Sequence, residues 1–436
     1  MNLGPASSSV AGPVFAPLMR RAFYHARIIG NLALIQAVVQ ILSFLSGILV
    51  IRSLSQQEYA YFTIANTMQG TLNLLADIGI SVGVVSIGGR VWQDRHRFGQ
   101  LISTGLQLRK KLALFSCLFV VPVLYLLLAR NGAGFAYRWI LVALVVGGLL
   151  PQLSSGILSV VPRLRSDIGR IQFIDFSTAA LRLVGLVAFL WLLSAATAIA
   201  IAMVSFFVQY LMLRQYTTRV VDIRASADVE DGDVIVRFIR KLAPNAVFYC
   251  FQGQITVFLI SIFAQRVSAV AEVGALGRLA MIFAVLSNLL ANVFIPAFAR
   301  CHEVRKLRFL YVGVVGGVTA FGAFVIALAA FFPTQFLFVL GNRYTHLGPE
   351  LLLMVSGAVI SALAGAIWGL NSAKGWISGS WLYIPSTLLT QLALIPFVDF
   401  TSVRGVLLFN LISAVPSVLL NLALSYRGFR GQHTTA

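Results

Sequence analysis

Charge is scarce in this chain of 436 residues, of which only 11% are Asp, Glu, Lys or Arg. Soluble domains typically have about a quarter of their residues charged, so the composition excludes an ordinary soluble domain. Acidic residues are the scarcer kind, with 14 against 33 basic residues and a formal net charge of +19. In a soluble protein this excess would indicate nucleic-acid binding. Basic loops on one side of a membrane account for it without a nucleic-acid partner.

Cysteine and catalytic motifs are also scarce. The three cysteines, Cys117, Cys250 and Cys301, have the spacing of neither a disulfide framework nor a metal site, and we interpret them as small core residues. The 5 histidines are widely separated along the chain. Phosphate-binding glycine loops and nucleophile motifs are missing. The sequence therefore predicts no enzyme, no metal and no cofactor, and a function that draws on gradients rather than on nucleotide hydrolysis.

Apolar residues, in contrast, make up 59% of the chain, and its mean hydropathy is +0.89. Apolar runs of about 20 residues recur along its whole length, long enough as helices to cross a ~30 Å hydrocarbon core. They do not alternate as the strands of a membrane barrel would. We therefore expect an all-α polytopic membrane protein with about twelve transmembrane helices. The predicted spans are 28–51, 57–80, 112–129, 139–161, 171–193, 195–213, 242–264, 270–298, 309–332, 350–371, 377–398 and 404–425.

The distribution of basic residues predicts the orientation of these spans. Residues 1–27 place a Gly/Pro/Ser-rich stretch before Arg20 and Arg21, the reverse of a signal peptide, so we expect a retained, flexible cytoplasmic tail. With the N-terminus inside, 25 of the 33 basic residues fall in cytoplasmic segments. This asymmetry predicts that both termini are cytoplasmic, including a short tail at 426–436.

A duplication divides the spans into two sets of six. The hydrophilic segment 214–241 separates the sets and is expected to be a cytoplasmic linker between an N-lobe, 28–213, and a C-lobe, 242–425. A shift of 214 residues aligns 27–80 with 241–294 and gives ten identities. The polar identities are Asn31/Asn245, Gln40/Gln254, Arg52/Arg266 and Glu58/Glu272. Six spans per repeat give two parallel repeats, an arrangement typical of transporters that rock around a central site.

Several motifs stand out along the chain. They are R-x-L-x-x-x-E-Y at 52–59, LLADIGIS at 74–81, LRSDIGRIQFIDFSTAALRLV at 164–184 and a weaker second copy at 265–296. Together they resemble those of Wzx-type polysaccharide flippases, a family of the MATE-like (MOP) exporter superfamily. The resemblance implies two lobes in a V around a cavity that opens alternately to either side of a bacterial inner membrane. It also implies a substrate, an undecaprenyl-diphosphate-linked oligosaccharide, flipped to the periplasmic leaflet for surface polysaccharide biosynthesis. A coupled proton or sodium ion and a glycan polymerase with other assembly proteins remain open as further partners.

Two arginines within the spans are candidate ligands for the diphosphate, because guanidinium binds phosphate oxygens through paired donors. Arg182 lies near the middle of its span, where a charge is costly, and Asp175 seven residues earlier is an alternative structural partner. Arg278 could extend outward to the membrane surface instead. Its counterpart in the first repeat is Ile64, and a charge present in only one repeat indicates an asymmetric ligand rather than scaffold.

Two carboxylates are candidates for ion coupling or gating, Asp77 and Asp175. Asp77 also lacks a charged counterpart, since Ala291 takes its place in the second repeat. It precedes a run of glycines that would let the helix bend, and capping of the helix end is the alternative role. In contrast, Arg52 and Glu58 recur in both repeats, so we interpret them as a polar hinge of a helical hairpin, with an ion pair left open.

Uncharged amides within the spans either bridge helices or contact sugar hydroxyls in the cavity. They are Asn31, Gln36, Gln40, Asn66, Asn73, Asn245, Gln252 and Gln254. Two other functions stay open. A multidrug or cation antiporter of the same fold would call for buried carboxylates, and a membrane glycan polymerase or ligase would need a long external catalytic loop.

Overall fold

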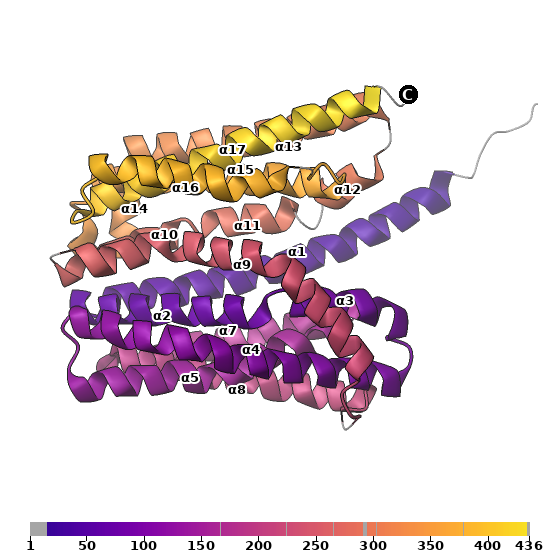
Figure 1. Cartoon of the computed structure of the whole chain (residues 1–436), viewed down its shortest axis with the longest axis horizontal. Helices are drawn as coiled ribbons and strands as arrows, with labels where there is room; N and C mark the ends of the chain where they lie inside the picture. The colour runs from indigo at the N-terminus through magenta and orange to yellow at the C-terminus, as the bar shows by residue number, and fades with distance from the viewer. Residues whose placement is uncertain are drawn as a thin grey trace, which may run out of the picture.

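The computed structural model describes residues 15–433, apart from Ser166, Arg224, Gln265, 291–293, His302 and Ser378. Side chains are described from Leu34 to Arg430, and within the helices Lys241, Leu242, Asn245, Ala284, Asn288, Pro296 and Arg300 are further exceptions. All regular elements in this part of the chain are helices (Figure 1). Nine of them are long and apolar enough to cross a membrane, and one bent pair adds a tenth. The protein is a multi-pass membrane protein.

The helices form two lobes lying side by side in Figure 1. The N-lobe comprises α1 (Phe15–Ser53), α2 (Gln56–Asp77), α3 (Ile80–Val91), α4 (Arg95–Arg130), α5 (Phe135–Leu158), α6 (Val160–Leu164), α7 (Ile168–Ala188), η1 (Leu190–Leu192) and α8 (Ala195–Val220). The C-lobe comprises α9 (Val229–Phe263), α10 (Val267–Leu279), α11 (Ile282–Leu289), α12 (Ile295–Arg300), α13 (Val304–Phe331), α14 (Pro333–Leu340), η3 (Asn342–Tyr344), α15 (Gly348–Ala373), η4 (Ser380–Leu382), α16 (Tyr383–Leu394), η5 (Ile395–Phe397) and α17 (Val403–His433).

The predicted all-α fold of about twelve spans is confirmed. Three predicted spans are broken into shorter helices. The span 57–80 is divided between α2 and α3, the span 270–298 between α10, α11 and α12, and the span 377–398 is formed by η4, α16 and η5. The other predicted spans each correspond to one long helix, or to α5 with its short continuation α6.

Polar residues in the turns set where helices begin. The Ser55 hydroxyl accepts a hydrogen bond from the backbone N–H of Glu58 and caps α2, as small polar N-cap residues commonly do. Ser194 and Thr197 form a reciprocal capping box at the start of α8. Asp94 caps α4 by accepting from the backbone N–H groups of the next turn, and these bonds lower the pKa of its carboxyl.

The bend in the second span lies where the glycine run begins. Between α2 and α3 the axis turns by 46°, and Gly79 adopts φ 80°, a conformation that costs glycine little. The Asp77 carboxylate accepts from the backbone N–H of Ser81 at 3.3 Å and from its hydroxyl at 2.7 Å. Asp77 therefore caps α3, and the helix bends where the glycines allow it.

The segment 214–241, expected to be a linker, is largely helical. The helix α8 continues to Val220 and α9 begins at Val229. The first turns of α9 are tied to the N-lobe, because the Arg97 guanidinium donates two hydrogen bonds, of 2.6 and 2.8 Å, to the Asp231 carboxylate. Pro244 lies within α9, and beyond it the helix bends toward the C-lobe (Figure 1). One long helix therefore connects the two lobes.

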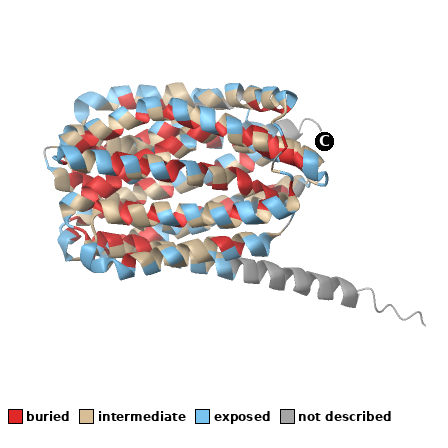
Figure 2. Ribbon diagram, turned by 90° about the horizontal axis from the view of Figure 1, so that it is seen from below, coloured by how far each residue is buried: buried red, intermediate tan, exposed pale blue. Residues whose placement is uncertain are grey.

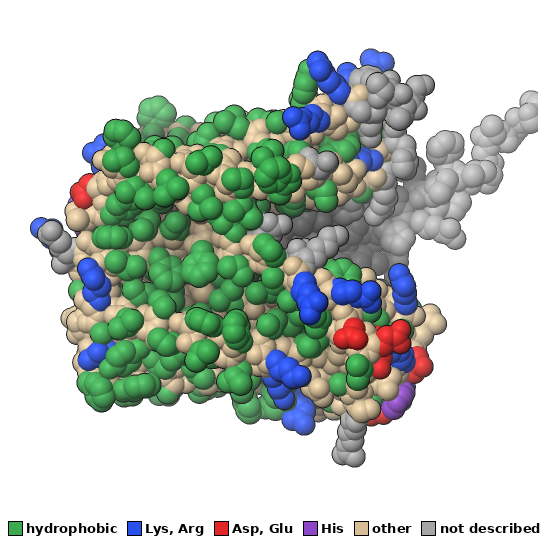
Figure 3. All heavy atoms as spheres, viewed as in Figure 1, with side chains coloured by type: hydrophobic (Ala, Val, Ile, Leu, Met, Phe, Trp, Pro, Cys, Tyr) green, Lys and Arg blue, Asp and Glu red, His purple; other side chains and the backbone are tan. Residues whose placement is uncertain are grey.

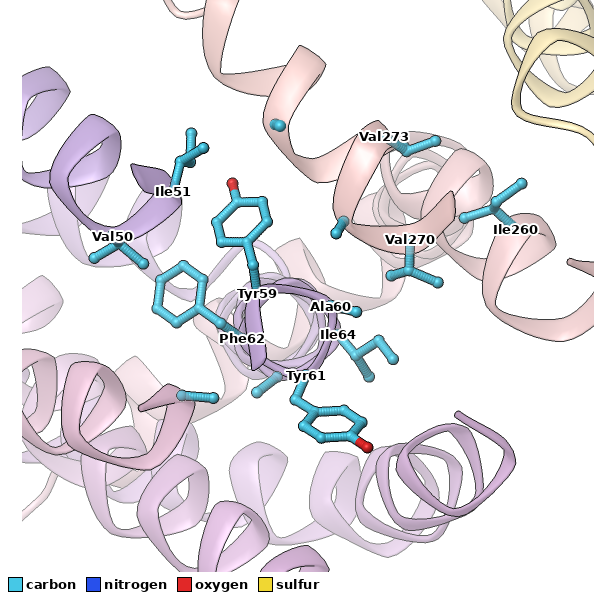
Figure 4. Close-up of a cluster of buried hydrophobic side chains, with 14 of the residues drawn as sticks. Val50, Ile51, Tyr59, Ala60, Tyr61, Phe62, Ile64, Ile260, Val270 and Val273 are labelled. Atoms are coloured by element: carbon cyan, nitrogen blue, oxygen red, sulfur yellow. The ribbon is translucent and has the colours of Figure 1, made fainter. Parts of the chain in front are cut away.

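The buried core runs between the helices, and apolar side chains cover the outside. Figure 2 shows buried residues concentrated on the inward faces of the helices. Large apolar side chains point outward, among them Trp191, which is 96% exposed, and Phe397, which is 84% exposed. A surface of this kind is stable against lipid. One cluster of core residues crosses from α2 to α9 and α10, including Tyr59, Val270 and Ile260 (Figure 4).

Candidate functional site: the space between the lobes

A single face of α2 runs along the boundary between the lobes. Its residues follow the alternating four- and three-residue spacing that keeps side chains on one side of a helix. They are Tyr59, Thr63, Asn66, Gly70, Asn73 and Asp77. The first two are buried, whereas Asn66 is exposed and Asn73 and Asp77 are half-buried. The same face is therefore packed at the start of α2 and open further along.

The packed half of this face contacts α10. A Cβ atom at Gly274 would lie 2.3 Å from Oγ1 of Thr63 and 2.7 Å from its Cγ2, so the two helices approach as closely as they do only because residue 274 is glycine. We call this end of the molecule, where α1 ends and α2 begins, the closed end.

Two arginines join the lobes at the closed end, and each donates to backbone carbonyls of the other lobe. Arg52 of α1 donates from Nε to Val339 O at 3.1 Å and from Nη2 to Phe338 O at 2.5 Å. Arg343 of the C-lobe donates from Nη1 to Leu54 O at 2.6 Å. The contacts are reciprocal and involve no carboxylate.

The lobes separate at the opposite end, which we call the open end. Many Lys and Arg side chains lie on the described surface of both lobes at this end in Figure 3. Asn66, Asn73 and Asp77 lie further along the same face of α2, toward this end. That part of the face is polar.

Arg278 lies between the closed end and the open end. Its guanidinium carbon is 5.9 Å from the centre of the Phe62 ring, and its charge acts on the hydroxyl of Tyr59. A Cβ at Gly47 of α1 would be 3.6 Å from Nη1 of Arg278. The acceptors near its guanidinium are the Tyr59 hydroxyl and the weak Met281 sulfur, the latter 4.0 Å from Nη1. The arginine is thus surrounded by helices of both lobes.

Arg182 of α7 lies close enough to Arg278 for their charges to repel each other. Its Nε atom is buried and has no hydrogen-bond partner. Within the described part of the chain, neither arginine forms an ion pair. Buried charges are normally paired, so two adjacent cations from different lobes form a site suited to an anion.

Asp175 is not the partner of Arg182. Its carboxylate accepts a hydrogen bond from Gln209 Nε2 at 3.4 Å and interacts with the charge of Arg163. These residues line a polar cavity of about 200 Å³ inside the N-lobe, between α5, α7 and α8. The structural pair of Arg182 with Asp175, one of the two alternatives from the sequence, is therefore absent. The physical reason is the ~10 Å rise of seven helical residues.

The glutamines of α1 share a face with Gly47. Gln36 and Gln40 precede Gly47 by eleven and seven residues, spacings that return to the same side of a helix, about 16 and 10 Å along its axis. Both are half-buried. They lie on the side of Gly47, the residue next to Arg278, that is toward the open end.

The remaining amides divide between the two roles expected of them. Gln254 points toward α2, since its Nε2 lies 3.6 Å from where a Cβ of Gly70 would be. Gln252 instead accepts a hydrogen bond of 2.9 Å from Gln391 of α16, and bridges helices inside the C-lobe. The side chains of Asn31 and Asn245 lie outside the described residues.

Arg109 is a site residue that the sequence reasoning missed. Its Nη2 lies 3.2 Å from the Asp77 carboxylate, and its side chain is only 9% exposed. Nη1 donates to Leu153 O at 3.0 Å, and a Cβ at Gly156 would collide with this guanidinium. The residue precedes two lysines, so it reads as part of a basic surface cluster. Its spacing from the buried residues Ile102, Gly105, Ala113 and Ser116 is the signal that could have identified it.

The hinge formed by Arg52 and Glu58 holds no ion pair. The Glu58 carboxylate accepts from the Tyr137 hydroxyl at 2.6 Å and from the backbone N–H of Ala195, the first residue of α8, at 2.7 Å. Carboxylates at helix N-termini are favourable. Glu58 therefore ties three helices of the N-lobe together, while Arg52 reaches the other lobe.

This arrangement of two lobes is the fold of MATE family transporters of the MOP superfamily. The chain is similar to an inward-facing multidrug resistance MATE transporter, with a TM-score of 0.67 and 15% identity over 93% of this chain and 99% of that one. An outward-facing conformation gives a TM-score of 0.61, with 16% identity over 93% and 95%. A MOP superfamily transporter from Pyrococcus furiosus, described as having a binding pocket of reverse polarity that suggests a different function, gives 0.57, with 16% identity over 91% and 94%.

Sequence comparison adds no closer relative. No protein-family model matches the chain, and no curated protein sequence matches it. Identities of 14–18% to the solved structures show the fold alone.

Proposed function

We propose that this protein is an alternating-access transporter that flips an undecaprenyl-diphosphate-linked oligosaccharide from the cytoplasmic to the periplasmic leaflet of a bacterial inner membrane. The observation that carries the proposal is the pair Arg182 and Arg278. They come from opposite lobes, repel each other and have no carboxylate partner among the described residues. A diphosphate between them would replace repulsion with charge-assisted hydrogen bonds, and it would be held by both lobes at once.

The open end is proposed to face the cytoplasm. The basic residues gathered around it support this orientation, and it agrees with the cytoplasmic termini predicted from the sequence. The lobes 28–213 and 242–425 would then rock about the closed end to release the substrate outside. An inside-negative potential favours outward movement of a diphosphate by ~2.3 kcal/mol per charge per 100 mV.

The polar walls suit the glycan and the coupling step. Asn66 and Asn73 on α2, with Gln36 and Gln40 on α1, offer amides to sugar hydroxyls in a hydrated space. Asp77 lies at the bend and pairs with Arg109, so protonation or sodium binding there would change both the ion pair and the cap of α3. Asp175 in the N-lobe cavity is the second candidate for coupling.

A cation antiporter is the second candidate function, and Asp175 is the observation that favours it. Its carboxylate lines a polar cavity of the N-lobe, and multidrug MATE transporters are among the similar structures. The unpaired arginines between the lobes argue against organic cations as substrates, because they would repel them.

The test measures surface polysaccharide in a strain that depends on this protein. Arg182→Ala and Arg278→Ala are each expected to abolish the polysaccharide at unchanged protein level, whereas the Lys variants retain part of it. Arg138→Ala is the matched control, since its Nε is also buried without a partner but its guanidinium lies over Tyr125, 4.8 Å from the ring centre, away from the lobe boundary. Normal polysaccharide in both Ala variants would refute the roles. Drug sensitivity of the deletion strain with intact polysaccharide would favour the antiporter.

A further inference from the structure

A second arginine-lined site lies at the closed end, away from Arg182 and Arg278. It is a pocket of about 360 Å³ on the seam between the lobes. The pocket is lined by Ile51, Arg52, Phe338, Leu340, Gly341, Asn342, Arg343 and Tyr344. Arg52 belongs to α1 of the N-lobe and the residues from Phe338 onward belong to the C-lobe, so the pocket exists only while the closed end is closed.

Both guanidinium groups of this pocket have N–H donors that are not used in hydrogen bonds to the protein. Arg52 uses Nε and Nη2, and Arg343 uses Nη1, for backbone carbonyls, which leaves N–H groups of both side chains without a protein acceptor. The lining residues include no carboxylate. Burial raises the pKa of Tyr344, so its hydroxyl stays neutral and adds no negative charge. Two exposed cations and the Asn342 amide therefore face a hollow that has no carboxylate among its lining residues, although the charge of Glu272 reaches Tyr344.

The repeat provides a comparison within the same molecule. The counterpart of Arg52 in the second repeat is Arg266, which also lines a pocket of about 360 Å³ together with a second arginine, Arg404. That pocket contains two carboxylates, Glu272 and Glu350. Its charges are balanced by the protein, whereas those of the seam pocket are not. The excess of positive charge is thus a property of the seam and not of the helical hairpin.

We infer that the seam pocket binds a phosphate group, as inorganic phosphate or as the headgroup of an anionic phospholipid. The bound group accepts hydrogen bonds from Arg52 and Arg343 and bridges the two lobes. A ligand that binds only the closed arrangement stabilises that arrangement. Phosphate groups on this side of the membrane therefore hold the closed end shut. The inference does not depend on which substrate the central space carries.

The binding test uses the purified full-length protein in neutral detergent. Isothermal titration and thermal unfolding are followed with inorganic phosphate, and with chloride at matched ionic strength. We expect phosphate to bind and to raise the unfolding temperature, and Arg343→Gln to weaken binding at least tenfold. Glutamine keeps a polar side chain but removes the charge. Arg404→Gln, which changes the balanced pocket, is the control and should bind as the wild type does.

The source of the phosphate group is separated by a second arm in lipid nanodiscs. If phosphatidylglycerol but not phosphatidylcholine raises the unfolding temperature, and Arg343→Gln removes the effect, the ligand is a lipid headgroup. An effect of inorganic phosphate in both lipids identifies the free ion. The inference fails if neither ligand acts, or if Arg343→Gln responds as the wild type does. Arg52→Gln repeats the test on the other lobe, so a folding defect of one variant leaves the question decidable.

Discussion

Close packing at the closed end depends on Gly274, which has no side chain, so a single substitution there should destabilise the closed end. A Cβ at Gly274 would lie 2.3 Å from Oγ1 of Thr63 and 2.7 Å from its Cγ2, closer than real Cβ contacts come. We therefore expect Gly274→Ala to push α10 away from α2. Overpacking of this kind typically costs ~1–3 kcal/mol. When the closed end opens, the two helices part and the cost disappears, so it falls on the closed state alone.

A cost of that size changes the populations measurably. Since 1.4 kcal/mol is a factor of ten, we expect Gly274→Ala to shift the ratio of closed to opened molecules by about 5- to 150-fold. Spin labels at Arg130 and Thr345, which are exposed on the two lobes at this end, report the change as a longer distance in pulsed electron paramagnetic resonance on a cysteine-free background. Gly313→Ala is the control, because a Cβ there meets nothing within 4 Å.

The reasoning also predicts a rescue. Thr63→Ala removes the two atoms nearest to the added methyl group, Oγ1 and Cγ2, and should return the distance distribution of Gly274→Ala toward that of the wild type. Two results would refute the account: an unchanged distribution in Gly274→Ala, or a shifted one that Thr63→Ala does not restore. The second result would mean that the methyl group acts on the fold of α10 rather than on its contact with α2.

Two further substitutions test ties within the N-lobe. Glu58→Gln replaces a carboxylate that accepts from the Tyr137 hydroxyl and the Ala195 N–H, and should destabilise the protein by about 1–2 kcal/mol; an unchanged thermal unfolding temperature would contradict this. Asp77→Asn leaves Arg109 buried without its charge partner. Because the Asp77 side chain is 33% exposed, we expect the free energy of unfolding to fall by about 1–3 kcal/mol rather than by the full cost of breaking a buried pair. A melting curve equal to that of the wild type would show that the ion pair with Arg109 does not stabilise the protein.

The features predicted well from the sequence are those that the membrane imposes locally. Apolar runs of span length predict helices because the backbone must satisfy its own hydrogen bonds in lipid. The glycine run after Asp77 could be recognised as a place where the helix can bend, because Gly79 can take a left-handed conformation that other residues avoid.

What the sequence could not show is which distant residues meet. The proximity of Arg182 to Arg278 arises from the packing of α7 and α10 around α1, and no local pattern encodes it. Arg109 looked like a surface residue because Lys110 and Lys111 follow it, yet only Arg109 turns inward on α4. Arg52 and Arg266 are identical in the two repeats but face different surroundings, since one reaches across the seam and the other shares a pocket with carboxylates.

The chemistry of the seam matches the work that the proposed transport cycle must do. The three hydrogen bonds that Arg52 and Arg343 donate across it end on carbonyls, and exposed bonds of this type contribute about 0.5–1.5 kcal/mol each. Their sum, about 1.5–4.5 kcal/mol, is comparable to the ~4.6 kcal/mol that a membrane potential of 100 mV supplies to two negative charges. Buried ion pairs would cost more to break. For the proposed diphosphate substrate, contacts of this strength would close the path and still yield to the charge that the substrate carries.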